Sequence, residues 1–114
     1  MLNCYRVSLI VDQPEITTDP GSTEIIERGD LTLTCSAVGN PTPSISWTKD
    51  GSLINAGGDP RINITEQNTK LRITNVSRAD DGQYRCVASN GLGNATSNPA
   101  TVDVRCKYTN REVA

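Results

Sequence analysis

Cysteine is the residue type in this sequence with the most definite chemistry. The chain of 114 residues holds four of them, at positions Cys4, Cys35, Cys86 and Cys106. Cysteines at this density in a short chain are typical of disulfides and of an oxidising compartment, and four leave three pairings open. A zinc site is disfavoured because the chain has no histidine and no C-x-x-C spacing. We therefore expect disulfides and no bound metal.

The side chains that catalysis requires are poorly represented. Without histidine, neither a Ser–His nor a Cys–His arrangement can form. Asp80 and Asp81 are adjacent, so in extended or turn backbone their carboxylates point apart and cannot act as a close pair. The glycine-rich stretches at residues 56–59 and 90–93 lack a following helix, so neither is expected to bind phosphate. The sequence predicts a protein that is not an enzyme and uses no cofactor.

Three asparagines lie in N-x-S/T acceptor sequences for N-linked glycan, namely Asn63, Asn75 and Asn94. A glycan at any of them would indicate a secreted protein. In a chain this rich in Asn, Ser and Thr, about two such sequences arise by chance. The sequons therefore agree with secretion but do not establish it.

Alternating apolar residues predict the strands that would position the internal cysteines. Tyr84, Cys86 and Ala88 share one face of a strand with a period of two residues. The alternation over residues 31–37 likewise places Cys35 on an inward side. Two inward cysteines on two such strands can face each other through a core. A bridge between them would close a loop of roughly fifty residues and stabilise the fold by about 4 kcal/mol.

A third alternating run carries Ile45 and Trp47, whose bulk would pack against such a bridge. A cysteine on the second strand, a tryptophan on the third and a tyrosine two residues before the second cysteine resemble the immunoglobulin fold. The resemblance is closest to the I-set domains of cell-adhesion molecules, growth-factor receptor ectodomains and muscle proteins. The matching stretches are residues 27–35, 39–51, 71–76, 80–86 and 88–93.

This resemblance implies an all-β fold, a two-sheet antiparallel sandwich of the I-set type. It also implies that Cys35 pairs with Cys86, and that Trp47 and Tyr84 lie in the core. The chain then divides into an N-terminal lead or extra edge strand, the domain, and a C-terminal tail or linker. These segments are residues 1–13, 14–105 and 106–114.

In similar domains an aspartate pairs with an arginine across the bottom of the sandwich, and the matching residues here are Asp80 and Arg61. A partly buried bidentate Arg–carboxylate contact is stronger than a surface ion pair. Tyr84 resembles the tyrosine corner, whose hydroxyl bonds to backbone a few residues upstream. Gly82 is expected to adopt a φ that other residues reach only at a cost.

The remaining pattern predicts short strands, a glycine-rich loop and no helix longer than a single turn. The turn is expected at residues 76–80 and the loop at 55–60. The expected strands are residues 15–18, 24–26, 31–37, 45–49, 52–54, 61–65, 69–74, 83–88 and 96–105.

Length and charge narrow the range of possible functions and partners further. A chain of this length holds one domain. The net charge is −2 with no run of Lys or Arg, so nucleic acid is not an expected partner. No apolar run approaches the length of a membrane span, so this segment is not expected to insert into a membrane. No basic-then-apolar leader is present, so the cellular address has to be inferred from the cysteines and sequons.

Cys4 and Cys106 lie near the two chain ends and leave alternatives open. They could bridge each other if residues 7–11 form an edge strand, because residues 5–13 must then run back along the domain. They could equally be free thiols, or they could link two molecules.

We expect a protein-recognition module of an extracellular or cell-surface adhesion or receptor protein, as the I-set resemblance implies. Its partner would be a protein, bound homophilically or heterophilically, and its parent chain would carry neighbouring immunoglobulin-like domains. One sheet face is the candidate contact surface, because Val87 is apolar at an outward position. The face comprises Ser46, Thr48, Gln83, Arg85, Val87, Thr101 and Asp103.

The alternative interpretation of this face is that a single outward-facing valine is normal on a protein surface and indicates no contact. The alternative function is a structural spacer in a tandem immunoglobulin array, whose contacts are only with its neighbours. Such an array could be extracellular or belong to an intracellular muscle-type protein, and a glycan on any of the three sequons would exclude the latter.

Overall fold

The computed structural model describes residues 11–106. This part of the chain is built from short strands and two single turns of 3-10 helix. The strands are β1 (Asp12–Thr18), β2 (Thr23–Ile26), β3 (Leu31–Thr34), β4 (Ser36–Asn40), β5 (Ser44–Lys49), β6 (Ser52–Leu53), β7 (Ile62–Thr65), β8 (Lys70–Ile73), β9 (Gly82–Ser89), β10 (Asn94–Thr96) and β11 (Ala100–Arg105). The helical turns are η1 (Ala56–Gly58) and η2 (Arg78–Asp80).

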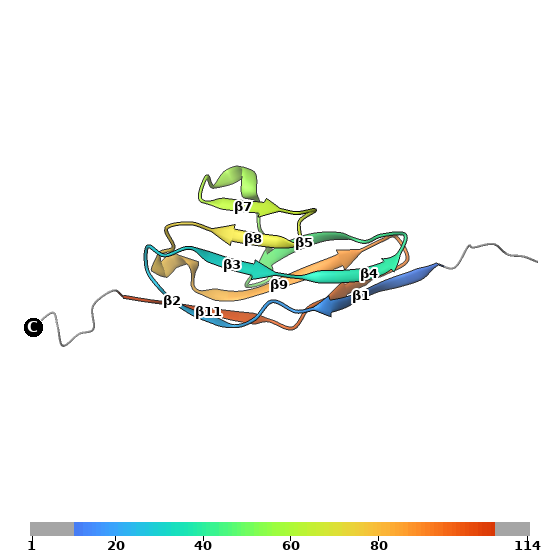
Figure 1. Cartoon of the computed structure of the whole chain (residues 1–114), viewed down its shortest axis with the longest axis horizontal. Coiled ribbons are helices and arrows are strands. Elements are labelled where there is room, and N and C mark those ends of the chain that lie inside the picture. The colour runs from blue at the N-terminus through green and yellow to red at the C-terminus, as the bar shows by residue number, and fades with distance from the viewer. Residues whose placement is uncertain (1–10, 107–114) are drawn as a thin grey trace, which may run out of the picture.

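The strands pack as two layers, which confirms the predicted β-sandwich (Figure 1). One layer has the strand order β2-β11-β9-β5-β6, with β10 paired to β9. The other contains β3-β8-β7, and β4, paired with β1, continues β3 beyond Cys35. Within residues 11–106 no helix is long and apolar enough to cross a bilayer.

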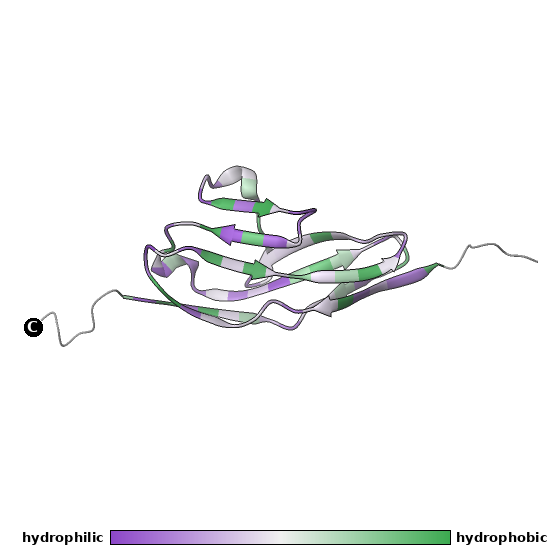
Figure 2. Cartoon of the chain, in the orientation of Figure 1, coloured by the Kyte–Doolittle hydropathy of each residue, from purple (hydrophilic) through white to green (hydrophobic). Residues whose placement is uncertain are grey.

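Alternating burial along the strands produces one core between the layers. In β9, Tyr84, Cys86 and Ala88 are buried, while the residues between them are partly exposed. Alternating hydropathy is visible along β7 and β8 in Figure 2. The core residues are Leu31, Leu33, Cys35, Ile45, Trp47, Leu71, Ile73, Val76, Tyr84, Cys86, Ala88, Ala100, Val102 and Val104.

The predicted last strand, residues 96–105, is interrupted in the structure. β10 pairs Thr96 with Val87, whereas β11 pairs Ala100 with Tyr84, so the register shifts by one residue between them. Ser97 fills the break, since its Oγ accepts a hydrogen bond from the Cys86 N–H at 2.9 Å and its own N–H donates to the Cys86 carbonyl at 2.9 Å. One extra residue in one strand is a β-bulge, and alternation alone does not reveal it.

Three smaller differences from the expected elements concern β1 and the two helical turns. β1 begins at Asp12, two residues before the expected domain boundary at residue 14. The glycine-rich loop contains the helical turn η1, which begins after Asn55, whose side chain accepts from the Gly57 N–H. The expected helical turn at residues 76–80 is present as η2 over its last three residues.

Candidate functional site

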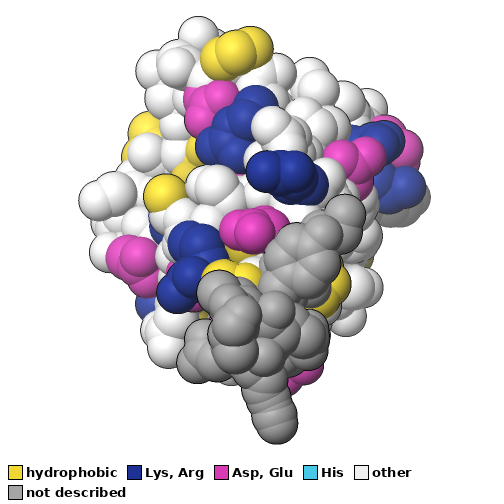
Figure 3. All heavy atoms as spheres, turned by 90° about the vertical axis from the view of Figure 1, so that its left-hand side faces the viewer, with side chains coloured by type: hydrophobic (Ala, Val, Ile, Leu, Met, Phe, Trp, Pro, Cys, Tyr) yellow, Lys and Arg dark blue, Asp and Glu magenta, His cyan; other side chains and the backbone are white. Residues whose placement is uncertain are grey.

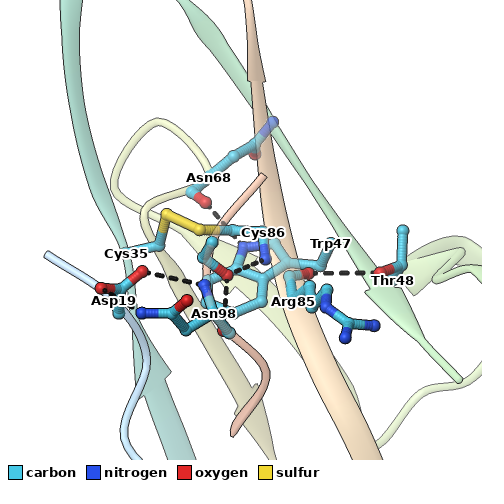
Figure 4. Close-up of a disulfide and its surroundings, with 9 residues drawn as sticks. Asp19, Cys35, Trp47, Thr48, Asn68, Arg85, Cys86 and Asn98 are labelled. Carbon is cyan, nitrogen blue, oxygen red and sulfur yellow. Dashed lines mark hydrogen bonds between the residues drawn. A yellow bond between two sulfur atoms is a disulfide. The ribbon is translucent and has the colours of Figure 1, made fainter. Parts of the chain in front are cut away.

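The disulfide joins Cys35 and Cys86, as the resemblance implied, and both cysteines are fully buried. Trp47 on β5 lies directly opposite Cys86 on β9, and its side chain is 1% exposed (Figure 4). The indole Nε1–H donates to the Asn68 carbonyl at 2.8 Å, and the Asn68 side chain donates to the Ile45 carbonyl at 3.0 Å. Asn68 therefore ties the turn before β8 to β5, a role that the sequence analysis missed.

Arg61 and Asp80 form the predicted bidentate pair at the pole where β11 ends. The two guanidinium nitrogens lie 2.9 and 3.2 Å from the two oxygens of Asp80. Asp59 accepts from Arg61 at 3.1 Å, and the Ser77 N–H donates to Asp80 at 2.8 Å. The Asp80 side chain is only 10% exposed, so this carboxylate depends on the donors around it.

Opposing effects act on the pKa of Asp80. Burial favours the neutral acid, but the hydrogen bonds from Arg61 and from the Ser77 N–H outweigh it and hold the pKa below its usual value. Hydrogen bonds from the backbone and side chain of Arg61 also lower the pKa of Asp59. Both carboxylates are therefore charged at neutral pH.

Tyr84 links this ion pair to the core. Its hydroxyl donates to the Asp80 carbonyl oxygen at 2.6 Å, which is the bond to upstream backbone expected of a tyrosine corner. Burial and the Asp80 charge raise the pKa of Tyr84 well above its usual value, so the hydroxyl remains a donor.

Gly82, at the start of β9, has a positive φ of 155°. A Cβ at this position would lie 2.8 Å from Oδ2 of Asp50. The same Asp50 carboxylate accepts from the Gln83 N–H at 2.9 Å, so it cannot move away freely. Both the backbone angle and the close approach therefore require glycine.

The predicted contact face is assembled on the outer side of the β2-β11-β9-β5-β6 layer. β5 and β9 place Ser46 beside Val87 and Thr48 beside Arg85, and β9 and β11 place Gln83 beside Thr101. None of the seven predicted face residues is buried. In Figure 4 the Arg85 and Thr48 side chains lie on the far side of their strands from the disulfide.

The face also includes Leu53, which the sequence analysis missed. β6 pairs Leu53 with Thr48, so both side chains point outward, and Leu53 is 70% exposed. The adjacent Asp50 and Gly51 are a hairpin signal in the sequence that could have placed Leu53, because a two-residue turn fixes which residues lie opposite each other.

The sequons are all at exposed positions but lie on different sides of the molecule. Asn63 is on β7 in the opposite layer, and Asn75 follows β8 near the pole. Asn94 begins β10 and pairs with Ser89, so it lies on the same layer as the face but at its far end.

The terminal cysteines are not paired by the described residues. Cys106 is exposed and forms no disulfide with another residue of the range 11–106, and its Sγ accepts from Arg78 at 2.9 Å. Cys4 and the proposed edge strand at residues 7–11 lie outside the described residues, except for Val11. A Cys4–Cys106 bridge therefore stays a prediction.

Over residues 11–106 no group of three or more acidic or cysteine side chains could hold a metal ion. Figure 3 views the pole where β11 ends, and there positive and negative side chains are interspersed rather than gathered into a patch of one sign.

A family comparison agrees with this architecture. The model of the immunoglobulin I-set domain matches residues 14–104. The chain belongs to this family. Its β-sandwich fold, its Cys35–Cys86 disulfide and its buried Trp47 and Tyr84 are those that the sequence resemblance implied.

Several relatives of this I-set domain are much longer proteins. It is 38% identical to neural cell adhesion molecule L1 of Takifugu rubripes, over 86% of this chain and 8% of that protein. It is 42% identical to human Roundabout homolog 2, over 80% of this chain and 6% of that protein. Among solved structures, the tandem Ig repeats of Dlar align with a TM-score of 0.77 at 34% identity, covering 82% of this chain and 49% of theirs. The chain thus spans less than a tenth of either curated relative.

Proposed function

We propose that this I-set domain is a non-enzymatic protein-recognition module of an extracellular or cell-surface protein, and that it binds through the outer face of β5, β9 and β11. One observation carries the proposal. Arg85 lies near the middle of this face, and among residues 11–106 its guanidinium has no ion-pair partner. An unpaired cation among uncharged side chains offers a partner a charge to neutralise.

The cellular setting follows from the covalent chemistry and from the relatives. A buried disulfide forms and persists in an oxidising environment. One relative is named as a cell-adhesion molecule. Binding of another protein is therefore the function we assign, in place of catalysis by this domain.

The test uses the secreted chain, clustered as tetramers, and measures its saturable binding to intact animal cells. Arg85→Ala and Leu53→Ser should each weaken binding several-fold, since both remove exposed groups from the face. Arg72→Ala, on the opposite layer, is the matched control and should bind as the wild type does. Loss of binding in the Arg72 variant alone, or no saturable binding at all, would overturn the proposal.

The second candidate function is a spacer in a tandem array. The described chain enters at one end of the long axis and leaves at the other (Figure 1), which suits head-to-tail connection. The similarity to tandem Ig repeats points the same way. A spacer would show no saturable binding to cells, and substitutions on the face would have no effect on it.

A further inference from the structure

The outer face carries charge at two separate places. At one, Arg85 projects from β9 beside Thr48 and Gln83, and no carboxylate among residues 11–106 contacts it within ion-pair distance. This place has a net charge of about +1.

At the other place, two carboxylates share one cation. Arg105 lies 3.0 Å from Asp103 and 3.1 Å from Glu24, and all three side chains are roughly half exposed or more. Two carboxylates and one guanidinium leave a net charge of about −1. A hollow of about 250 Å³ adjoins these carboxylates and is lined by Ser22, Thr23, Glu24, Thr101 and Asp103. Its walls are largely apolar and two carboxylates stand at them, so this acidic recess suits the aliphatic stem and the guanidinium of an incoming arginine.

The strand register fixes how the two places are related. Gln83 on β9 pairs with Thr101 on β11. Arg85 is two residues from Gln83 in one direction, and Asp103 is two residues from Thr101 in the opposite direction. At about 3.3 Å per residue, the two charges lie about 13 Å apart along the strands. The uncharged pair Gln83–Thr101 lies at the midpoint between them.

This spacing makes the face complementary to itself. We propose that two copies of the chain associate face to face about a two-fold axis that passes between the faces over the Gln83–Thr101 pair. Arg85 of each copy then enters the acidic recess of the other and pairs with Asp103. A two-fold contact forms each such pair twice, as isologous interfaces do. The inference rests on the proposed function and identifies the partner of that face as a second copy.

The sequons at Asn63 and Asn94 are compatible with this contact. Asn63 is on the opposite layer. Asn94 pairs with Ser89, which lies about 20 Å from Gln83 along β9. Glycans at these positions would stand outside the stretch between Arg85 and Asp103.

The experiment is sedimentation equilibrium of the secreted chain, with free thiols alkylated so that no new disulfide can form. Over about 10 μM to 1 mM, a range that spans weak interfaces, we expect a monomer–dimer equilibrium that weakens as salt is added. Arg85→Glu and Asp103→Lys should each raise the dimer dissociation constant at least about tenfold, because each places like charges opposite one another twice.

Mixing the two variants gives the decisive arm. In a mixed dimer the introduced carboxylate faces the introduced ammonium, and the other pair is native, so association should return to near the wild-type level. Arg72→Glu and Asp30→Lys make the same charge changes in an ion pair on the opposite layer. Each of these controls should dimerise as the wild type does.

Each outcome separates the two proposals. A chain that stays monomeric throughout, or variants whose mixture does not associate, overturns the two-fold contact. If that same monomer still binds cells in a manner that depends on Arg85 and Leu53, the recognition function stands and its partner is another protein. If cell binding is also absent, both proposals fail.

Discussion

The Arg61–Asp80–Tyr84 group joins the pole of the sandwich to its core. Asp80 is held below its usual pKa in the folded state, so its contribution to stability is present above the unfolded pKa of about 4 and is lost as the pH falls through the folded value. We expect the free energy of unfolding to fall below about pH 4. Asp80→Asn should flatten the part of this pH dependence that belongs to Asp80, as measured by urea denaturation from pH 7 to pH 2.

A double-mutant cycle tests whether the pair acts as a unit. Arg61→Ala and Asp80→Asn should each destabilise the fold by about 2 kcal/mol, because each leaves a partly buried charged or polar group without its partner. The double variant should lose clearly less than the sum of the two. Additive losses in thermal or urea melts would show that the two side chains do not interact.

Sequence reasoning at the residue scale succeeded where a side chain's role is tied to a motif. Arg61, Asp80, Tyr84 and Gly82 took their expected places. Asn68 was missed because its bond to Trp47 is made by a backbone carbonyl, which any residue in that turn could provide. Its positive φ of 69° gave no sequence signal beyond the general tolerance of Asn for that region.

At the scale of elements, the disulfide connects the two layers. Cys35 and Cys86 are 51 residues apart in sequence and both are fully buried. Replacing them together by Cys35→Ala and Cys86→Val should cost about 4 kcal/mol, since the unfolded chain regains the freedom of that loop. Chemical denaturation of the double variant measures the loss. An unchanged midpoint would contradict the role assigned to the bridge.

The bulge between β10 and β11 depends on one hydroxyl. Ser97 is 5% exposed and its Oγ is the acceptor for the buried Cys86 N–H. Ser97→Ala should destabilise the fold by about 1–3 kcal/mol, because that N–H is left without a partner. Thermal unfolding measures it, and Asn98→Ala, at an exposed neighbour, is the control for side-chain truncation in the same segment.

Alternating apolar residues predicted where strands form, but they did not predict where a strand is interrupted. The run at residues 83–88 alternates clearly and lies within β9. The run at residues 31–37, expected as one strand, is divided at Cys35 into β3 and the start of β4. The break at residues 97–99 depends on a register shift against β9, which is a property of the paired strands and not of either sequence alone. Pro99 was the available sequence signal for this break, because proline has no N–H to donate a hydrogen bond to the neighbouring strand.

For the whole molecule, the fold was predictable and the partner was not. The spacing of the cysteines, the tryptophan and the tyrosine predicted the fold, because the side chains of these residues must meet in one core. A binding surface is set by charges on separate strands, and only the register shows that Arg85 and Asp103 flank Gln83 and Thr101. The alternating pattern predicted the face, while the acidic recess beside it required the structure.

A glycan placed on the outer face of β5, β9 and β11 should block the protein binding that we propose for this face. Val87→Asn creates the acceptor sequence Asn-Ala-Ser on the face, and Arg72→Asn creates Asn-Ile-Thr on the opposite layer. After intact mass confirms each added glycan, tetramer binding to cells should be abolished by the first and preserved by the second. Equal binding by both glycosylated variants would show that this face does not bind the partner.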